Sequence, residues 1–207
     1  MSRSRAVLPH YSPFVPSQGE WININEVPPR KFHCAYCDAD TGSKQGWVNV
    51  PSGGSTIIAQ ILVCQNCNQP TYFEGSGQVP ASGLGKSVEH VPEPVDSLYR
   101  EARRCTTVGA YTGAALLCRT LLMYVAVQKG AGPGRDFPDY MNYLASKAYI
   151  PHDSKKWVER LIKMGGEAAH AVTPKGEQQA EDILTFAEML LKNVYEMPAR
   201  AGKSDTK

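Results

Sequence analysis

The sequence lacks any long apolar run and any marked excess of one charge. Its longest apolar stretch, around residues 114–127, is interrupted by Arg119, whereas a membrane-spanning helix needs about 20 largely apolar residues. The N-terminal residues lack the apolar core of a signal peptide. The 22 basic and 20 acidic side chains give a net charge of +2, so composition provides no general attraction to nucleic acid. These absences predict a soluble, cytoplasmic protein that does not enter a membrane.

Cysteine is scarce but unevenly placed. Four of the six cysteines form two C-x-x-C pairs, Cys34 with Cys37 and Cys64 with Cys67, and 26 residues separate the pairs. The other two stand alone in sequence typical of helices. Because no export signal is present, reduced thiols are a better interpretation than disulfides. Metal binding is then the leading explanation of the pairs, and redox-active or metal-free pairs are the alternative.

The spacing of the two pairs suits a zinc ion. Zn²⁺ prefers four tetrahedral ligands, and each C-x-x-C turn directs two thiolates toward one ion. Two such turns fill the coordination shell, so the pattern predicts one structural, non-catalytic zinc per chain. The segment is too short to fold on an apolar core alone, so the metal would supply much of its stability. His33 lies next to Cys34, but four cysteines suffice without it.

Composition divides the whole chain into successive parts. We expect an α+β protein, mostly α, in which a small β zinc ribbon precedes a bundle of about five helices. The predicted parts are an N-terminal arm over residues 1–30, the zinc ribbon over 31–74, a Gly-, Ser- and Pro-rich linker over 75–93, the helical bundle over 94–198 and a flexible tail over 199–207. Within the arm, Trp21, Ile22 and Ile24 are candidates for local packing.

The sequence between the cysteine pairs is typical of a hairpin. Residues 47–50 alternate and residues 55–63 are β-branched, and a Pro-Ser-Gly-Gly turn signal lies between them. Four aromatic residues could either stack on bases or form the small core of the ribbon: Tyr36, Trp47, Tyr72 and Phe73. The segment 31–74 has a net charge of −1 and no basic stripe, so contact with RNA is only weakly supported.

Five helices are predicted, at about residues 94–108, 111–129, 137–148, 154–169 and 175–196. Asp153 is the expected N-cap of the fourth, Thr173 with Pro174 opens the fifth, and Pro198 ends it. The second helix is apolar nearly all round and therefore central.

Arg119 lies in the middle of this apolar second helix, and a buried guanidinium needs an acceptor. The candidate partners are Glu101, Glu159, Glu167 or the C-terminus of a helix. A structural salt bridge inside the bundle is favoured over a catalytic role for this arginine.

Residues 163–170 read K-M-G-G-E-A-A-H inside the predicted fourth helix. Two adjacent glycines weaken a helix by about 1 kcal/mol each, and their best explanation is close approach of another helix. Glu167 and His170 are three residues apart, so they share a face. Together with Lys163 and Arg119 they are the candidate catalytic residues of the helical part.

Several of these segments resemble a known family. The similarity lies in a zinc ribbon followed by Y-R-E-A-R at 99–103, G-A-A-L-L-C-R at 113–119, G-G-E-A-A-H at 165–170 and the closing segment L-T-F-A-E-M-L-L-K-N-V-Y at 184–195. Through these segments the chain is similar to the bacterial family called domain of unknown function 4145. The resemblance covers about residues 31–198. Its helical domain looks distantly related to the HEPN superfamily, which implies a HEPN-like bundle and a homodimer formed through it. Many members of that superfamily are ribonucleases of toxin, immunity and phage-defence systems.

The resemblance also implies where catalysis would lie. In the catalytic HEPN pattern an arginine precedes a histidine by four to six residues, and the histidine acts as general acid or base. Here Arg160 is ten residues before His170 and Lys163 is seven, and Gly166 stands where the family usually has asparagine. Only His170 carries over.

Two functions therefore compete. The first is a zinc-binding interaction or regulatory module, with a second copy and a further protein as partners, in a bacterial or phage defence system. The alternative is a metal-independent endoribonuclease that uses His170. The departures from the catalytic pattern favour the first, and whether the chain is an enzyme stays open.

Overall fold

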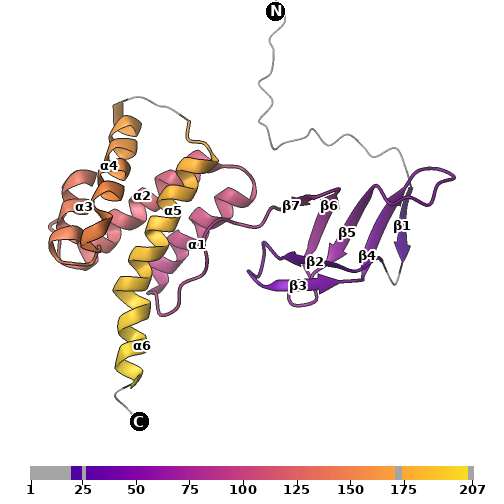
Figure 1. Cartoon of the computed structure of the whole chain (residues 1–207), viewed down its shortest axis with the longest axis horizontal. Coiled ribbons are helices and arrows are strands. Elements are labelled where there is room, and N and C mark those ends of the chain that lie inside the picture. The colour runs from indigo at the N-terminus through magenta and orange to yellow at the C-terminus, as the bar shows by residue number, and fades with distance from the viewer. Residues whose placement is uncertain (1–19, 25–26, 171–173, 205–207) are drawn as a thin grey trace, which may run out of the picture. The chain divides into compact units, whose positions relative to one another are not determined.

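The computed structural model describes residues 20–24, 27–170 and 174–204, and it describes no side chains for residues 20–24, 164–170 and 203–204. The chain folds as two compact units, residues 1–82 and 83–207. The first contains small β-sheets and the second contains helices (Figure 1). This confirms the predicted α+β class, with strands in the N-terminal part and five helical segments after them.

The first unit consists of two antiparallel sheets. A five-stranded sheet has the order β1-β4-β5-β6-β7, and β2 and β3 form a separate two-stranded sheet. The strands are β1 Glu20–Ile24, β2 Arg30–His33, β3 Asp40–Ser43, β4 Gly46–Val50, β5 Ala59–Val63, β6 Pro70–Glu74 and β7 Gly77–Val79.

The core of this unit lies on one face of the larger sheet. Val48, Leu62 and Phe73 are buried there, and the Phe73 ring meets the Phe32 ring of β2 edge-on at a centroid distance of 5.1 Å. The aromatic residues of the ribbon therefore have different roles: Phe73 belongs to the core, whereas Trp47 is 37% exposed.

Three segments differ from the sequence-based prediction. The β4–β5 hairpin forms, but β5 begins only at Ala59, and Ile57 packs against the core from the connecting loop. The predicted N-terminal arm contains β1, which pairs with β4. The range 75–93, for which composition predicts a linker, contains β7, which pairs with β6.

The second unit is a helical bundle. Its elements are α1 Glu93–Thr107, α2 Tyr111–Gln128, α3 Phe137–Ser146, the 3-10 turn η1 His152–Ser154, α4 Lys155–His170, α5 Glu177–Leu191, the π-helical turn η2 Lys192–Glu196 and α6 Met197–Ser204. The segments α5, η2 and α6 follow one another without a break. No helix within the described ranges is long and apolar enough to cross a membrane.

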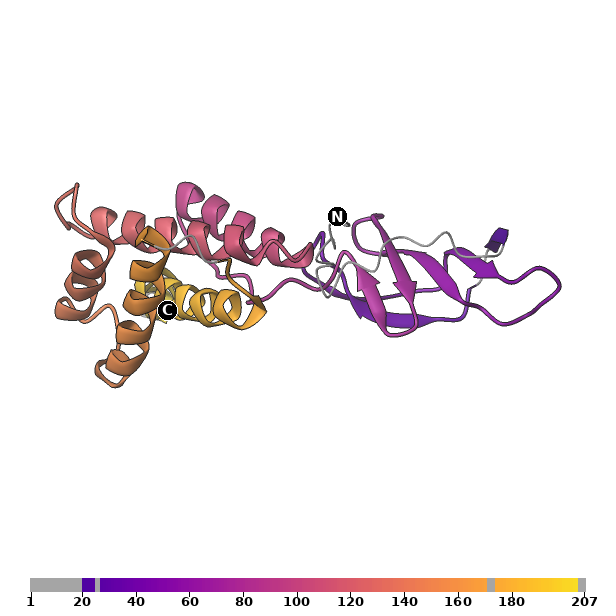
Figure 2. The same ribbon diagram turned by 90° about the horizontal axis from the view of Figure 1, so that it is seen from above.

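The central position of α2 agrees with its apolar sequence. It packs against α1, α3 and α5, and Figure 2 shows α1 alongside it. Leu121 and Leu122 of α2 are completely buried, as is Phe186 of α5. Trp157 of α4 meets Phe186 edge-on at 5.1 Å, which fixes the first half of α4 on the bundle.

The helix ends agree only in part with the predicted caps. Asp153 lies in η1, directly before α4. The last helix begins at Glu177, where the Gly176 amide donates to the Gln179 side chain at 2.9 Å; Thr173 lies outside the described residues.

Pro198 does not end this last helix, which continues through α6. The Met197 amide donates to the Lys192 carbonyl, a π-type spacing that widens the turn just before the proline. We attribute the continuation to this wider turn, because a proline ring otherwise clashes with the carbonyl four residues earlier.

Candidate metal centre

Two loops of the first unit have the same local structure. Each follows one strand of a hairpin and leads into the next: residues 34–39 connect β2 to β3, and residues 64–69 connect β5 to β6. In the first loop, the Cys34 amide donates to the Ala39 carbonyl at 3.0 Å and the Asp38 amide donates to the Cys34 carbonyl at 2.9 Å. The sequence C-x-x-C thus forms a tight turn that points two sulfur atoms the same way.

The second loop repeats this pattern. The Cys64 amide donates to the Gln69 carbonyl at 3.0 Å, and the Asn68 amide donates to the Cys64 carbonyl at 2.9 Å. Asp38 and Asn68 occupy equivalent positions, each with φ of 58°. Aspartate and asparagine tolerate this left-handed conformation better than most other residues, which explains why one of them follows each pair.

The two turns bring four sulfur atoms together. The Sγ atoms of Cys34, Cys37, Cys64 and Cys67 all lie within 4.8 Å of one another. Across the two loops, the Cys34–Cys67 distance is 3.6 Å and the Cys37–Cys64 distance is 3.8 Å. A regular tetrahedron with metal–sulfur bonds of about 2.3 Å has sulfur–sulfur edges of about 3.8 Å. The cluster therefore has the size of a four-thiolate metal site.

The thiols of this cluster differ in acidity. Burial raises the pKa of Cys67 to about 12, and hydrogen bonds with the neighbouring thiols act in the same direction. Burial also acts to raise the pKa of Cys64, but the amides of Cys67 and Asn66 and two cysteine side chains lower it to about 6. The protein alone thus favours a thiolate at Cys64. A bound cation would stabilise the other thiolates, because metal coordination deprotonates cysteine.

Neighbouring groups support the sulfur atoms. Asn66 donates its backbone amide to Cys64 Sγ and its side-chain amide to Cys37 Sγ, each at 3.4 Å. Such contacts fix ligand orientation and tune a metal site. Because Asn66 belongs to the second loop and Cys37 to the first, it also joins the two loops.

His33 is engaged elsewhere and is no ligand. One ring nitrogen lies 2.9 Å from an Asp38 carboxylate oxygen and the other lies 2.9 Å from an Asp40 carboxylate oxygen. The hydrogen bond with Asp38, followed by that with Asp40, raises the pKa of the His33 imidazole. The histidine thus ties together the two ends of the first loop.

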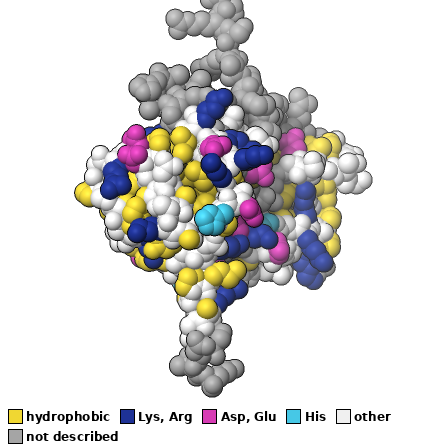
Figure 3. Space-filling view, turned by 60° about the vertical axis from the view of Figure 1, so that its left-hand side comes forward, with side chains coloured by type: hydrophobic (Ala, Val, Ile, Leu, Met, Phe, Trp, Pro, Cys, Tyr) yellow, Lys and Arg dark blue, Asp and Glu magenta, His cyan; other side chains and the backbone are white. Residues whose placement is uncertain are grey.

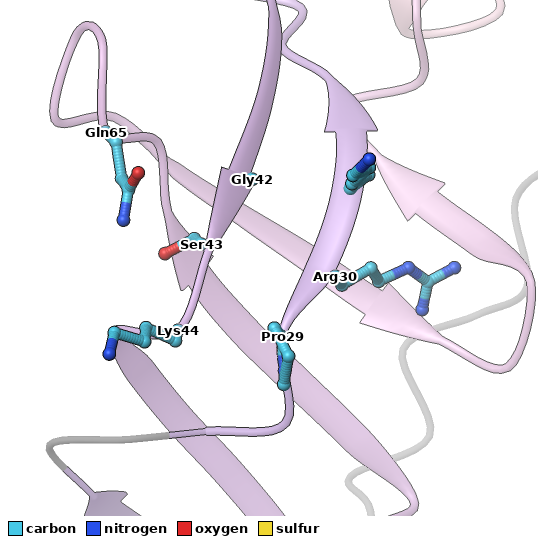
Figure 4. A pocket seen from close by; sticks show the side chains of 7 residues that line it. Pro29, Arg30, Gly42, Ser43, Lys44 and Gln65 are labelled. Carbon is cyan, nitrogen blue, oxygen red and sulfur yellow. The ribbon is translucent and has the colours of Figure 1, made fainter.

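An open pocket lies near the second loop. It has a volume of about 370 Å³. Residues around the start of β2 and around the end of β3 line it, together with Gln65. Its cationic residues are Arg30, Lys31 and Lys44. Figure 4 shows that Arg30 extends away from Lys44 and Gln65, and its guanidinium lies over the Phe73 ring at 4.2 Å. The cations therefore do not converge on one point.

Among the described side chains, the candidate catalytic residues of the helical bundle do not form a cluster. Arg119 is only partly buried, and its guanidinium lies over the Phe137 ring at 4.8 Å. This differs from the expected buried position, because one side of α2 reaches the surface, where Leu116 is 53% exposed. Lys163 is exposed on α4. The backbones of Glu167 and His170 belong to α4, but their side chains are not among those that the structure describes.

The surface of the bundle carries mixed charges. Arg160 of α4 lies 3.9 Å from the Asp182 carboxylate of α5. Figure 3 shows lysine and arginine side chains interspersed with acidic and apolar ones on the face in view. This face therefore has no continuous basic stripe of the kind that binds nucleic acid.

Sequence reasoning missed a polar clamp in the second unit. Residues 83–92, which we call the strap, precede α1 and lie against the bundle, with Val88 in its core. The Arg103 guanidinium of α1 donates to the carbonyls of Leu84 at 3.2 Å and Gly85 at 3.0 Å. The Tyr99 hydroxyl donates to the Lys86 carbonyl at 2.9 Å.

The last helix completes this clamp. The Lys86 amide donates to the Glu188 carboxylate at 2.9 Å, and the Glu89 amide donates to the Glu196 carboxylate at 3.0 Å. Gly85 has φ of +71°, and a Cβ atom there would lie 2.9 Å from the Tyr99 hydroxyl. The Y-R-E-A-R segment thus holds the strap in place. The sequence offered no signal for this beyond the segment itself, because every residue has a backbone carbonyl and the sequence does not show which carbonyls accept a hydrogen bond.

Comparison with known proteins gives one match. The family model described as Domain of unknown function (DUF4145) matches residues 100–207, just over half of the chain. The match includes Arg103 and both carboxylates of the clamp, and the four clustered cysteines lie outside it. No curated protein and no solved structure matches the chain.

Proposed function

We propose that this chain, which belongs to the family described as Domain of unknown function (DUF4145), is a zinc-binding interaction module. In this proposal the first unit is a zinc ribbon and the second is a HEPN-like bundle that forms a homodimer. The bundle presents a surface to a further protein, in a regulatory rather than a catalytic role.

The observation that carries this proposal is the four-sulfur cluster. Its sulfur–sulfur distances of 3.6 and 3.8 Å suit Zn²⁺, and four thiolates leave no position for a substrate or a reactive water. Cys34, Cys37, Cys64 and Cys67 would hold the ion, which would supply folding free energy to the ribbon rather than chemistry. The clamp around the strap likewise consists of structural contacts.

Metal content tests the zinc ribbon. Purified protein should contain about one zinc per chain. Cys64→Ser removes one ligand and should lower the content to well below one, with loss of the ribbon's folded NMR signals. Cys105→Ser is the matched control, because this partly buried cysteine lies outside the cluster and should retain full zinc. Equal zinc in both variants would reject the assigned ligands.

The homodimer is supported by an exposed apolar residue on α2. Leu116 is 53% exposed, and Thr112 and Thr120 lie one turn to either side, also exposed. Leu116→Asp should convert a dimer to a monomer in light scattering. Met197→Asp is the control, because Met197 is 54% exposed on α6. A monomeric wild type, or a dimer that survives Leu116→Asp, would contradict a dimer through this face.

The endoribonuclease alternative predicts a different result. Zinc-loaded wild type, His170→Ala and His152→Ala would be incubated with total RNA; His152 is an exposed histidine of the same unit. The module predicts no cleavage by any of the three. Cleavage that is lost with His170→Ala and kept with His152→Ala would replace our proposal by the nuclease.

A further inference from the structure

A lysine at the end of α2 lies among tyrosines from three parts of the bundle. The Lys129 ammonium is 4.7 Å from the centre of the Tyr195 ring in η2. It is 6.0 Å from the centre of the Tyr149 ring, which belongs to the connection between α3 and η1. Tyr124 of α2 completes the group, because charge on the Tyr124 and Tyr149 hydroxyls acts on the Tyr195 hydroxyl. We call these four residues the lysine–tyrosine cluster.

The cluster offers hydrogen-bond donors and one positive charge. Its four side chains are all half-buried. Burial raises the pKa of the Tyr195 hydroxyl, and the Tyr124 and Tyr149 hydroxyls raise it further, so Tyr195 keeps its proton at neutral pH. A phenol with its proton donates one hydrogen bond, and an ammonium donates three and accepts none.

Within the described part of the chain, these donors have no acceptor. The three hydroxyls form no hydrogen bond with a described group, and Lys129 forms no ion pair with a described carboxylate. Glu196 follows Tyr195 directly, but its carboxylate binds the Glu89 amide at 3.0 Å and the Arg200 guanidinium at 3.1 Å. The cluster therefore has unused donors and no negative charge.

The same polar atoms are accessible from outside. The buried side-chain nitrogen and oxygen atoms without a partner in the described residues belong to Asn49, Thr71 and Trp157. The hydroxyls and the ammonium of the cluster are not among them, so solvent reaches each one. A small ligand can reach them by the same route.

We propose that the lysine–tyrosine cluster binds a small oxyanion, a phosphate or a carboxylate group. Such a group supplies negative charge to Lys129 and acceptor oxygens to the three hydroxyls. An apolar ligand would leave these donors unpaired, and Lys129 would repel a cation. Tyr195 lies in the π-helical turn η2, and π turns are frequent at functional sites. The inference goes beyond the interaction module and depends neither on zinc nor on the dimer.

A second lysine and tyrosine show what a purely structural contact looks like. Lys147 lies over the Tyr143 ring at 6.0 Å, but it is exposed, and the Tyr143 hydroxyl already donates to the Lys129 carbonyl at 2.8 Å. An ammonium over a ring is stabilising by itself, so Lys147 has the ring contact without the unused hydroxyls. It is the matched control for Lys129.

NMR titration of the full chain, labelled on its tyrosine rings, tests the proposal. Sodium phosphate and sodium acetate are added separately at fixed neutral pH, and sodium chloride keeps the ionic strength constant. The Tyr195 and Tyr149 signals should shift and saturate with at least one of the two anions, which identifies the preferred group. Tyr36 of the first unit, which is 48% exposed, should not shift.

Variants assign the binding to the cluster. Lys129→Met keeps the length of the side chain without its charge and should raise the Kd about tenfold or more, because a charged hydrogen bond is lost. Lys147→Met should leave the Kd unchanged. Tyr195→Phe removes only a hydroxyl, so it should raise the Kd about fivefold with an unchanged unfolding temperature, which a merely structural role would not produce.

Three results would overturn the proposal. The first is the absence of saturation with both phosphate and acetate. The second is an equal shift when chloride alone is added. The third is the same Kd for Lys129→Met and Lys147→Met. If Lys129→Met does not fold, wild-type Kd values for both Tyr195→Phe and Tyr149→Phe would reject the site instead.

Discussion

Arg103 should be the most sensitive single position of the strap clamp. Its side chain is only 9% exposed, and it donates to the carbonyls of Leu84 and Gly85 at 3.2 and 3.0 Å. A hydrogen bond from a charged group contributes about 1.5–3 kcal/mol, and the contributions of two such bonds are not fully additive. Arg103→Ala should therefore lower the free energy of unfolding of the second unit by about 2–4 kcal/mol.

The loss can be measured by thermal unfolding followed by circular dichroism at 222 nm. The described helices all lie in the second unit, so this signal reports that unit. For about 125 residues, 2–4 kcal/mol corresponds to a fall in Tm of roughly 6–15 °C. Hydrogen exchange should show lost protection of the Lys86 amide, which donates to Glu188.

A neighbouring residue provides the control. Arg104 is exposed on α1, and Arg104→Ala should change the free energy of unfolding by less than about 0.5 kcal/mol. If the free energies of unfolding of Arg103→Ala and Arg104→Ala differ by less than about 0.5 kcal/mol, and the Lys86 amide stays protected from hydrogen exchange in Arg103→Ala, the clamp does not hold the strap and our reasoning is refuted.

Three further predictions follow from single contacts. Gly85→Ala should destabilise the second unit more than Gly109→Ala in urea titration, because both glycines have positive φ but only the first places a Cβ atom against another side chain; equal losses would contradict this. Asp136→Ala should cost about 1 kcal/mol by calorimetry, because its side chain caps α3, and an unchanged Tm would reject the cap. Asn66→Ala should weaken zinc affinity by about tenfold or more in chelator competition, because it removes the amide bonded to Cys37; wild-type affinity would reject the contact.

The cysteine cluster could be predicted because its determinants are local. Each C-x-x-C turn needs only the short loop around it, and the hairpin between the pairs brings the two turns together. The helices were predictable for a similar reason, since apolar periodicity is a feature of the segment itself. Of the two roles that the sequence left open for Phe73, base stacking or core packing, the structure shows core packing, because Phe73 is 2% exposed.

The remaining features depend on contacts between distant residues. Gly- and Ser-rich sequence indicated a linker at 75–93, yet its backbone amides and carbonyls are bound by Glu188 and Arg103. Pro198 indicated a helix end, but the π turn before it lets the helix continue. Arg119 was expected to be buried, but it lies partly exposed over Phe137, because apolar residues of α2 also reach the surface.

The central claim is that four cysteine sulfur atoms enclose one zinc ion. X-ray absorption at the zinc edge of the purified, metal-loaded protein measures this directly. The account predicts four sulfur ligands at about 2.3 Å and no nitrogen or oxygen ligand. A shell with fewer than four sulfur atoms, or with a bound water or imidazole, would contradict the closed structural site.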